Sequence, residues 1–301
     1  MLIVRASDMI RSELRTLHSH AGNDIVASFF YPDGEPRACV LIVPAMGVAQ
    51  KFYSPLALWL ASQDFLVATF DYVGIGLSRR SELRALEVNI IDWARFDCEA
   101  MIRAITNEAS AKPLNWLGHS LGGQIMALVP SCARVTKAVT IASGSGYWRD
   151  SPPGLKWRAW WMWYVAVPVA TRIWGYFPGK RLRKVGDLPR GVIEQWRRWC
   201  LDPHYNVGVE GPGIQAQFDA VKAPITSISF IDDEFMSLKN TESLHAFYRN
   251  APRTMQRFSP QQTGAARIGH FGFFNARFQE SLWRAHLLPE LACAQERRRM
   301  L

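Results

Sequence analysis

The chain alternates between short runs of apolar, often β-branched residues and longer segments whose apolar residues recur with helical spacing. This alternation is typical of buried parallel strands joined by crossover helices. It predicts an α/β fold with a mostly parallel central sheet flanked by helices. The expected strands are 25–31, 38–43, 65–70, 114–117, 137–142, 225–231 and 255–258, and the expected helices are 56–61, 90–105, 121–128, 241–248 and 276–286.

The first two expected strands are separated by a turn sequence. Pro32-Asp33-Gly34 combines three residues that favour tight turns. We therefore expect strands 25–31 and 38–43 to pair as an antiparallel hairpin.

The regular alternation is interrupted by a segment of different composition. From Trp148 to Trp199 the chain holds eleven Lys and Arg against three Asp and Glu, and eight of its twelve Trp. This segment carries eight of the nine net positive charges of the chain. We expect a helical cap at 146–212 inserted into one core domain, which consists of residues 1–145 and 213–301.

Composition excludes several classes of protein. Hydrophobic residues make up 49% of the 301 residues, which is enough for a core and too many for a disordered chain. Five scattered cysteines without CxxC spacing favour a reducing compartment, and the N-terminus lacks the apolar stretch of a signal peptide. The longest apolar run, 159–170, is too short to span a membrane. We therefore expect a cytoplasmic protein.

The strongest motif is Gly118-His119-Ser120-Leu121-Gly122-Gly123, which lies between an expected strand and an expected helix. A serine at a sharp strand-to-helix turn leaves no room for side chains two positions away on either side, so glycine belongs at 118 and 122. This placement predicts that Ser120 is a catalytic nucleophile. The Leu121 N–H would then donate to a developing oxyanion.

A serine nucleophile needs a histidine base and an acid later in the chain. Among the four histidines after Ser120, only His270 lies in a loop after the last expected strand, so we select it as the general base. The loop after strand 225–231 offers two acids, Asp232 and Asp233. The residues alone leave the choice between them open.

The second oxyanion donor is expected in the loop after strand 38–43. This loop begins Pro44-Ala45-Met46-Gly47, and the backbone N–H of Met46 is our candidate.

These motifs resemble the α/β-hydrolase superfamily, most closely its esterase, lipase and serine-aminopeptidase branch. The likeness extends to the loop that begins at Asp71, which is similar to that family's D-x-x-G-x-G-x-S loop. It implies an α/β-hydrolase fold and a Ser120–His270–Asp233 triad that cleaves an ester, or a thioester or amide, through an acyl-enzyme. The family's usual acid position maps onto Asp233, and Asp71 is expected to be structural.

A cap over such a site would supply the substrate pocket. We expect Trp157, Trp160, Trp161 and Trp163 to bind a hydrophobic acyl group, and the basic cap to allow peripheral contact with a membrane. The alternative is a non-catalytic scaffold whose cap binds a membrane surface or a protein.

No cofactor, metal or nucleic acid is expected as a partner. Arg79 stands where a dinucleotide motif starting at Gly74 needs its third glycine, and His18-Ser19-His20 has no further ligand nearby. The basic residues of the cap form no continuous stripe and accompany no nucleic-acid motif. The oligomeric state is left open.

Overall fold

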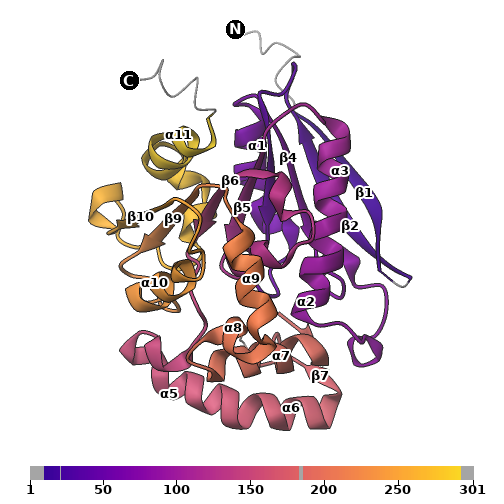
Figure 1. The fold of residues 1–301 in the computed structure, drawn as a ribbon, viewed down its shortest axis with the longest axis vertical. Helices are drawn as coiled ribbons and strands as arrows, with labels where there is room; N and C mark the ends of the chain where they lie inside the picture. Colours follow the sequence, from indigo (N-terminus) through magenta and orange to yellow (C-terminus); the bar gives the residue numbers. More distant parts are fainter. Residues whose placement is uncertain (1–9, 21, 183–185, 293–301) are drawn as a thin grey trace, which may run out of the picture.

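The computed structural model describes residues 10–20, 22–182 and 186–292, and its centre is an eight-stranded sheet (Figure 1). The strand order is β1-β2-β4-β3-β5-β6-β9-β10. All neighbours from β4 to β10 are parallel, whereas β2 is antiparallel to both β1 and β4. The strands are β1 (Arg11–His20), β2 (Asn23–Tyr31), β3 (Ala38–Val43), β4 (Phe65–Asp71), β5 (Leu114–His119), β6 (Val135–Ile141), β9 (Ile225–Phe230) and β10 (Arg253–Phe258).

Helices cover both faces of the sheet, and each face has its own apolar core. One core includes side chains of α3 and α9, and the other includes side chains of α1 and of the C-terminal helical segment. The helices of the core are α1 (Ser54–Ala61), α2 (Ile90–Asp92), α3 (Glu99–Glu108), α4 (Leu121–Gln124), α9 (Pro212–Ala220), α10 (Leu238–Ala246) and α11 (Leu288–Leu291).

Strand β3 shows why the sheet forms at this place in the chain. All six of its residues are buried, and they alternate between the two cores: Cys39, Leu41 and Val43 face one, while Val40 and Ile42 face the other. A continuous apolar run is what a strand with helices on both sides requires. The mostly parallel α/β sheet expected from the sequence is confirmed.

Most of the described chain between β6 and α9 forms a cap beyond the carboxyl ends of the central strands (Figure 1). Gln195 Oε1 accepts hydrogen bonds from the Ile90 and Ile91 N–H groups, which ties the cap to the start of α2. The cap contains α5 (Pro153–Trp161), α6 (Val167–Trp174), β7 (Tyr176–Phe177), β8 (Leu188–Pro189), α7 (Arg190–Leu201) and α8 (Tyr205–Glu210). The exact division at 146 and 212 stays a prediction.

The expected hairpin between the first two apolar strands is wrong. Strand β4 lies between β2 and β3, so that β2 pairs with β4 and β3 pairs in parallel with β4 and β5. A strand that is buried on both faces is stabilised best inside the parallel part of the sheet. On its other side β2 forms an antiparallel pair with β1, which the apolar pattern missed because most residues of β1 are exposed and polar.

Three expected helices are interrupted. The segment 90–105 is α2, a π-helical turn (Trp93–Cys98) and α3 in succession, and the expected helix 121–128 is α4 followed by a short 3₁₀ turn. Most of the last expected helix, 276–286, lies in a π-helical segment (Gln279–Leu287). Apolar periodicity located these segments but did not reveal the extra residue that each π turn accommodates.

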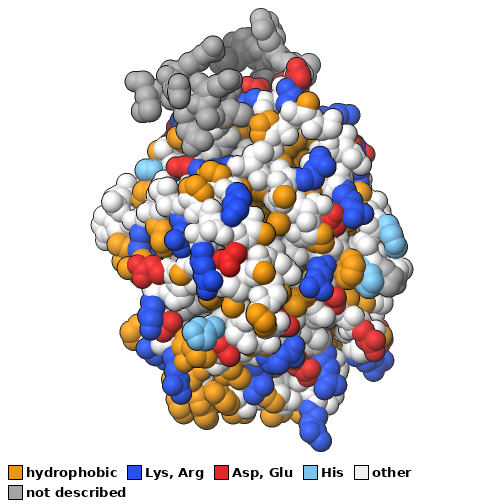
Figure 2. Space-filling view, in the orientation of Figure 1, with side chains coloured by type: hydrophobic (Ala, Val, Ile, Leu, Met, Phe, Trp, Pro, Cys, Tyr) orange, Lys and Arg blue, Asp and Glu red, His pale blue; other side chains and the backbone are white. Residues whose placement is uncertain are grey.

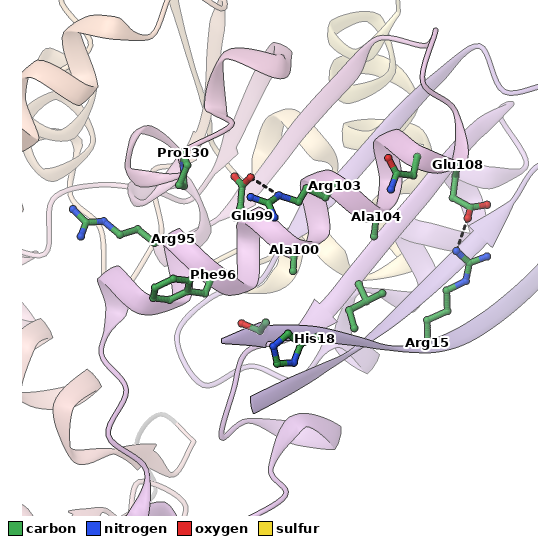
Figure 3. Close-up of a pocket in the computed structure, with 13 residues that line it drawn as sticks. Arg15, His18, Arg95, Phe96, Glu99, Ala100, Arg103, Ala104, Glu108 and Pro130 are labelled. Atoms are coloured by element: carbon green, nitrogen blue, oxygen red, sulfur yellow. Dashed lines mark hydrogen bonds and ion pairs between the residues drawn. The ribbon is translucent and has the colours of Figure 1, made fainter. Parts of the chain in front are cut away.

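A surface groove of about 680 Å³ lies between β1 and α3 (Figure 3). Its acidic side chains are paired with basic ones: Arg103 with Glu99, and Arg15 with Glu108 (Figure 3). No candidate catalytic residue lines it.

Asp97, next to this groove, is buried in the π-helical turn. It accepts hydrogen bonds from the Ser19 hydroxyl and the Val73 N–H, and burial raises the pKa of its carboxyl group to about 7. A raised pKa means that the folded state binds this proton more tightly than the unfolded state does. The stabilising contribution of Asp97 is therefore complete below pH 4 and is lost as the pH rises to 7.

We expect this contribution to appear when Asp97→Asn is compared with the original protein. At low pH the amide resembles the protonated acid, whereas above pH 7 only the original protein carries a buried charge. As the pH rises from 4 to 8, the free energy of unfolding of the original protein should therefore fall relative to that of the variant, by a few kcal/mol at most. Urea unfolding at a series of pH values measures this difference, and a difference that does not change with pH would contradict the raised pKa.

Candidate active site

Ser120 occupies a strained turn between β5 and α4. Its backbone has φ = 50° and ψ = −110°, a conformation that residues other than glycine rarely adopt. The Ser120 N–H donates to the Ile141 carbonyl over 2.9 Å, and the Ser143 hydroxyl donates to the Ser120 carbonyl over 3.0 Å. The strain is held by the surrounding structure, as is common at functional sites.

The two glycines expected around Ser120 are required by their surroundings. A Cβ at position 118 would lie 2.5 Å from the Gly122 carbonyl, and a Cβ at position 122 would collide with the Val43 carbonyl oxygen. Position 122 therefore packs directly against the carboxyl end of β3. This contact brings the start of α4 close to the loop that contains Met46.

His270 is paired with Asp233, the acid that the family resemblance favoured. The His270 Nδ1 lies 2.9 Å from Asp233 Oδ2 and 3.1 Å from Oδ1, and both side chains are buried. The Asp233 carboxylate also accepts hydrogen bonds from the Phe235 and Met236 N–H groups. A carboxylate can only accept here, so Nδ1 carries the proton and Nε2 keeps a free lone pair.

The two acids beside Asp233 hold the histidine loop through its backbone. Asp232 Oδ2 accepts hydrogen bonds from the Ile268 and Gly269 N–H groups, and Glu234 accepts one from the His270 N–H. The three consecutive acids therefore have separate roles: Asp233 contacts the imidazole, and its neighbours fix the loop that carries it.

His119 connects the turn at Ser120 to two other loops. Its Nε2 lies 3.1 Å from the His270 carbonyl oxygen and its Nδ1 lies 2.9 Å from the Tyr53 hydroxyl, which in turn accepts the Ala45 N–H. A carbonyl only accepts, so Nε2–H donates to it and Nδ1 accepts from Tyr53. Burial, together with the charge of His270, holds the pKa of His119 well below its ordinary value, so the ring stays neutral. Sequence reasoning missed this chain of hydrogen bonds, although His119 stands beside Ser120.

Leu121 and Met46, the two expected oxyanion donors, belong to segments that come close together, because Gly122 packs against the Val43 and Pro44 carbonyl oxygens. Leu121 is the first residue of α4, and Met46 is in a turn that ends with Val48 N–H bonded to Ala45. Within the part of the chain that the structure describes, neither the Leu121 N–H nor the Met46 N–H donates a hydrogen bond. Buried N–H groups are nearly always paired, so two that are not are available to a ligand.

The turn that carries Met46 is in contact with the cap. Gly47 has φ = 68°, and a Cβ there would lie 2.9 Å from the backbone nitrogen of Gly186. A Cβ on Gly186 would in turn lie 2.5 Å from the Gly47 carbonyl oxygen. The two backbones can meet this closely because neither residue has a side chain.

Asp71 is structural, as the resemblance implied. Its carboxylate accepts hydrogen bonds from the Gln50 and Leu77 N–H groups, and Gly76 lies against it without room for a side chain. Asp71 thus joins the end of β4 to the loop that leads into α1.

The four cap tryptophans expected to bind the acyl group do not come together. Trp157 and Trp161 lie on the exposed side of the cap, and Trp160 stacks on Trp157. Trp163 is buried against Trp196 on the opposite side. Two positions along a helix correspond to a rotation of about 200°, so 161 and 163 cannot share one face. The expectation of a common acyl pocket is therefore corrected.

Three phenylalanines from separate segments lie near the two histidines of the site. We call Phe52, Phe235 and Phe271 the aromatic mouth, since each residue is 37–39% exposed and its ring lies close to His270 or His119. Ring centroids are 5.1 Å apart for Phe235 and His270, and 4.9 Å apart for Phe271 and His270. The sequence signal available was the run of phenylalanines that follows His270.

Comparison with known families and structures is consistent with this geometry. Residues 34–176 match a family model described as serine aminopeptidase, S33. The match includes Ser120 but ends before Asp233 and His270. No curated protein sequence matches the chain significantly.

Several solved structures share the fold. A thermostable carboxyl esterase from Bacillus coagulans has a TM-score of 0.57 at 14% identity and covers 83% of this chain and 91% of its own. The esterase Pf2001 from Pyrococcus furiosus has a TM-score of 0.58 at 11% identity over 94% and 90%. An α/β serine hydrolase homologue from Coxiella burnetii has a TM-score of 0.54 at 16% identity over 93% and 97%. Identities this low establish likeness in fold alone.

Proposed function

Because the chain belongs to the α/β-hydrolase superfamily, we propose that it is a serine hydrolase that cleaves a carboxylic ester of a hydrophobic acyl substrate. The observation that carries the proposal is the buried His270–Asp233 pair, whose histidine contacts His119, the residue that precedes Ser120 in a strained strand-to-helix turn. His119, the residue before Ser120, contacts the ring and backbone of His270, which supports the placement of all three groups at one edge of the sheet.

In the proposed reaction, Ser120 Oγ attacks the carbonyl carbon while His270 Nε2 accepts the hydroxyl proton. Asp233 holds the imidazole in the required tautomer and stabilises the imidazolium that forms. The oxyanion of the tetrahedral intermediate receives hydrogen bonds from the Met46 and Leu121 N–H groups. His270 then protonates the departing alcohol, and water hydrolyses the acyl-enzyme by the same steps in reverse order.

The aromatic mouth is the observation that favours an apolar acyl group in the substrate. Half-exposed phenylalanine rings next to His270 offer a surface that binds alkyl or aryl chains and carries no charge. The ester remains our first choice of bond, although the matched family model is described as an aminopeptidase and the fold also occurs in a thioesterase domain.

A labelling experiment tests the proposal. The protein should react with a fluorophosphonate probe and should hydrolyse p-nitrophenyl esters faster than acyl-CoA thioesters or aminoacyl amides. Within the esters, kcat/KM should rise from acetyl to octanoyl chains. Absence of labelling in folded protein would favour the alternative, a non-catalytic scaffold.

The hydrogen bonds of His119 lead to a prediction about positioning. Tyr53→Phe removes the hydroxyl that joins the Ala45 N–H to His119, and His119→Phe removes both bonds of the ring. We expect kcat to fall about tenfold in the first variant and about a hundredfold in the second, with KM changed less, because each lost buried bond costs about 1–3 kcal/mol. His119→Gln, whose amide can still donate to the His270 carbonyl, should recover part of the loss in steady-state assays. If kcat in all three variants equalled that of the original protein, His119 would have no positioning role.

A further inference from the structure

One long helical segment forms the side of the cap that is remote from the sheet (Figure 1). It consists of α5, a π-helical turn (Met162–Ala166) and α6, and we call residues 153–174 the cap helix. At 1.5 Å per residue, it extends about 30 Å. Among the described residues, Trp148 packs edge-on against Tyr164 on its outer side, and large apolar side chains there remain exposed.

The cap helix places large apolar residues on its exposed side, whereas most amphipathic helices bury them. The residues on its buried side are mostly small, whereas large apolar residues are exposed. The exposed set is Trp157, Trp161, Tyr164, Val169 and Ile173, with Trp157 70% and Ile173 65% exposed. The step of five residues from Tyr164 to Val169 keeps both on one side, because the π turn accommodates one extra residue. We call this set the outer face.

The cap helix itself carries only positive charges. The sequence from 151 to 186 contains no Asp or Glu, whereas Lys156, Arg158 and Arg172 on the cap helix are exposed. Figure 2 shows orange side chains gathered at the lower end of the molecule, where Figure 1 places α5 and α6, with blue side chains beside them. Exposed apolar residues that occur singly need no explanation, but a contiguous set of this size indicates a binding surface.

We propose that the outer face docks on an anionic lipid bilayer, with the cap helix lying in the plane of the interface. Trp and Tyr prefer the boundary between acyl chains and headgroups, and Lys and Arg interact with anionic headgroups. In the part of the chain covered by the structure, no helix is long and apolar enough to cross a membrane. A second copy of the chain fits less well, because pairing two outer faces would bring like charges together.

Vesicle co-sedimentation tests the proposal without any measurement of hydrolysis. The protein should bind vesicles that contain phosphatidylglycerol, bind pure phosphatidylcholine much more weakly, and lose affinity as salt increases. Lys156→Glu combined with Arg158→Glu and Arg172→Glu should weaken binding at least tenfold. Val169→Ser with Ile173→Ser should weaken it about tenfold through loss of buried apolar area.

Two matched controls distinguish an effect of the outer face from a general effect of net charge or of exposed apolar side chains. Arg95→Glu with Arg134→Glu and Lys222→Glu makes the same change in net charge at exposed positions elsewhere, and Leu14→Ser removes an exposed apolar side chain from β1. Both should bind within about threefold of the original protein.

Three results would overturn the proposal. The first is failure of the folded protein to bind either vesicle, and the second is an equal loss of binding in the cap and control variants. The third is a dimer in analytical ultracentrifugation that Val169→Ser with Ile173→Ser dissociates, which would make a second copy the partner. Since Val169 and Ile173 belong to no proposed catalytic group, hydrolysis of a soluble ester should be unchanged in that variant. Failure of membrane binding and failure of the proposed hydrolysis are therefore distinguishable.

Discussion

Ser120→Ala is expected to lower kcat/KM for ester hydrolysis by roughly 10⁴- to 10⁶-fold and to abolish fluorophosphonate labelling. The substitution removes the only atom that could form the acyl-enzyme, whereas binding and the oxyanion donors remain. The fold should not change, because alanine needs the same backbone conformation as serine and fits the same space. His270→Ala should produce a loss of similar size, because the two groups act as one unit.

A second buried serine provides the control for Ser120. Ser145 lies in the loop after β6, and its hydroxyl has no hydrogen-bond partner among the described residues. Ser145→Ala should keep its labelling and its kcat/KM within about twofold. If Ser120→Ala were still labelled while its circular dichroism spectrum stayed native, the nucleophile would have to be assigned elsewhere.

Asp233→Asn is expected to reduce kcat/KM by about 10⁴-fold with little loss of stability. An amide in this position favours the His270 tautomer whose Nδ1 accepts, so that Nε2 carries the proton and cannot act as a base. The amide oxygen can still accept from the Phe235 and Met236 N–H groups, so the loop should remain in place. Steady-state kinetics and thermal unfolding of one preparation measure the two effects.

The neighbouring acid allows a direct contrast. Asp232 has the same chemistry but contacts only the Ile268 and Gly269 N–H groups in the described structure, so Asp232→Asn should cost about 1–2 kcal/mol of stability. Its kcat/KM should change less than tenfold. A larger loss of kcat/KM in Asp232→Asn than in Asp233→Asn would show that Asp232 is the acid of the triad.

Local sequence patterns were sufficient for the turn at Ser120. Gly118 and Gly122 are dictated by contacts within one short segment and its neighbouring strand, so their spacing reveals the turn. The choice of His270 rested on chain order and loop position, which follow from the expected alternation of strands and helices. Both inferences depend on backbone geometry that a few adjacent residues determine.

Features that depend on contacts between distant segments could not be predicted in this way. Tyr53 and His119 are 66 positions apart, and nothing in either residue type predicts a hydrogen bond between them. The pairing of β2 with β4 depends on which strand fits best between two helical layers, which a local turn signal cannot show. Closeness in sequence suggests one site for the four cap tryptophans, although helical rotation places Trp163 on the side opposite to Trp157 and Trp161.

The close approach of Gly186 to Gly47 has a consequence for engineering the protein. A chimera that receives its cap from another hydrolase would place new backbone against the turn that presents Met46. A bulkier residue at the junction would displace this turn, and with it one of the two proposed oxyanion donors. Specificity and turnover would therefore change together in such chimeras, unless the graft retains glycine at both positions.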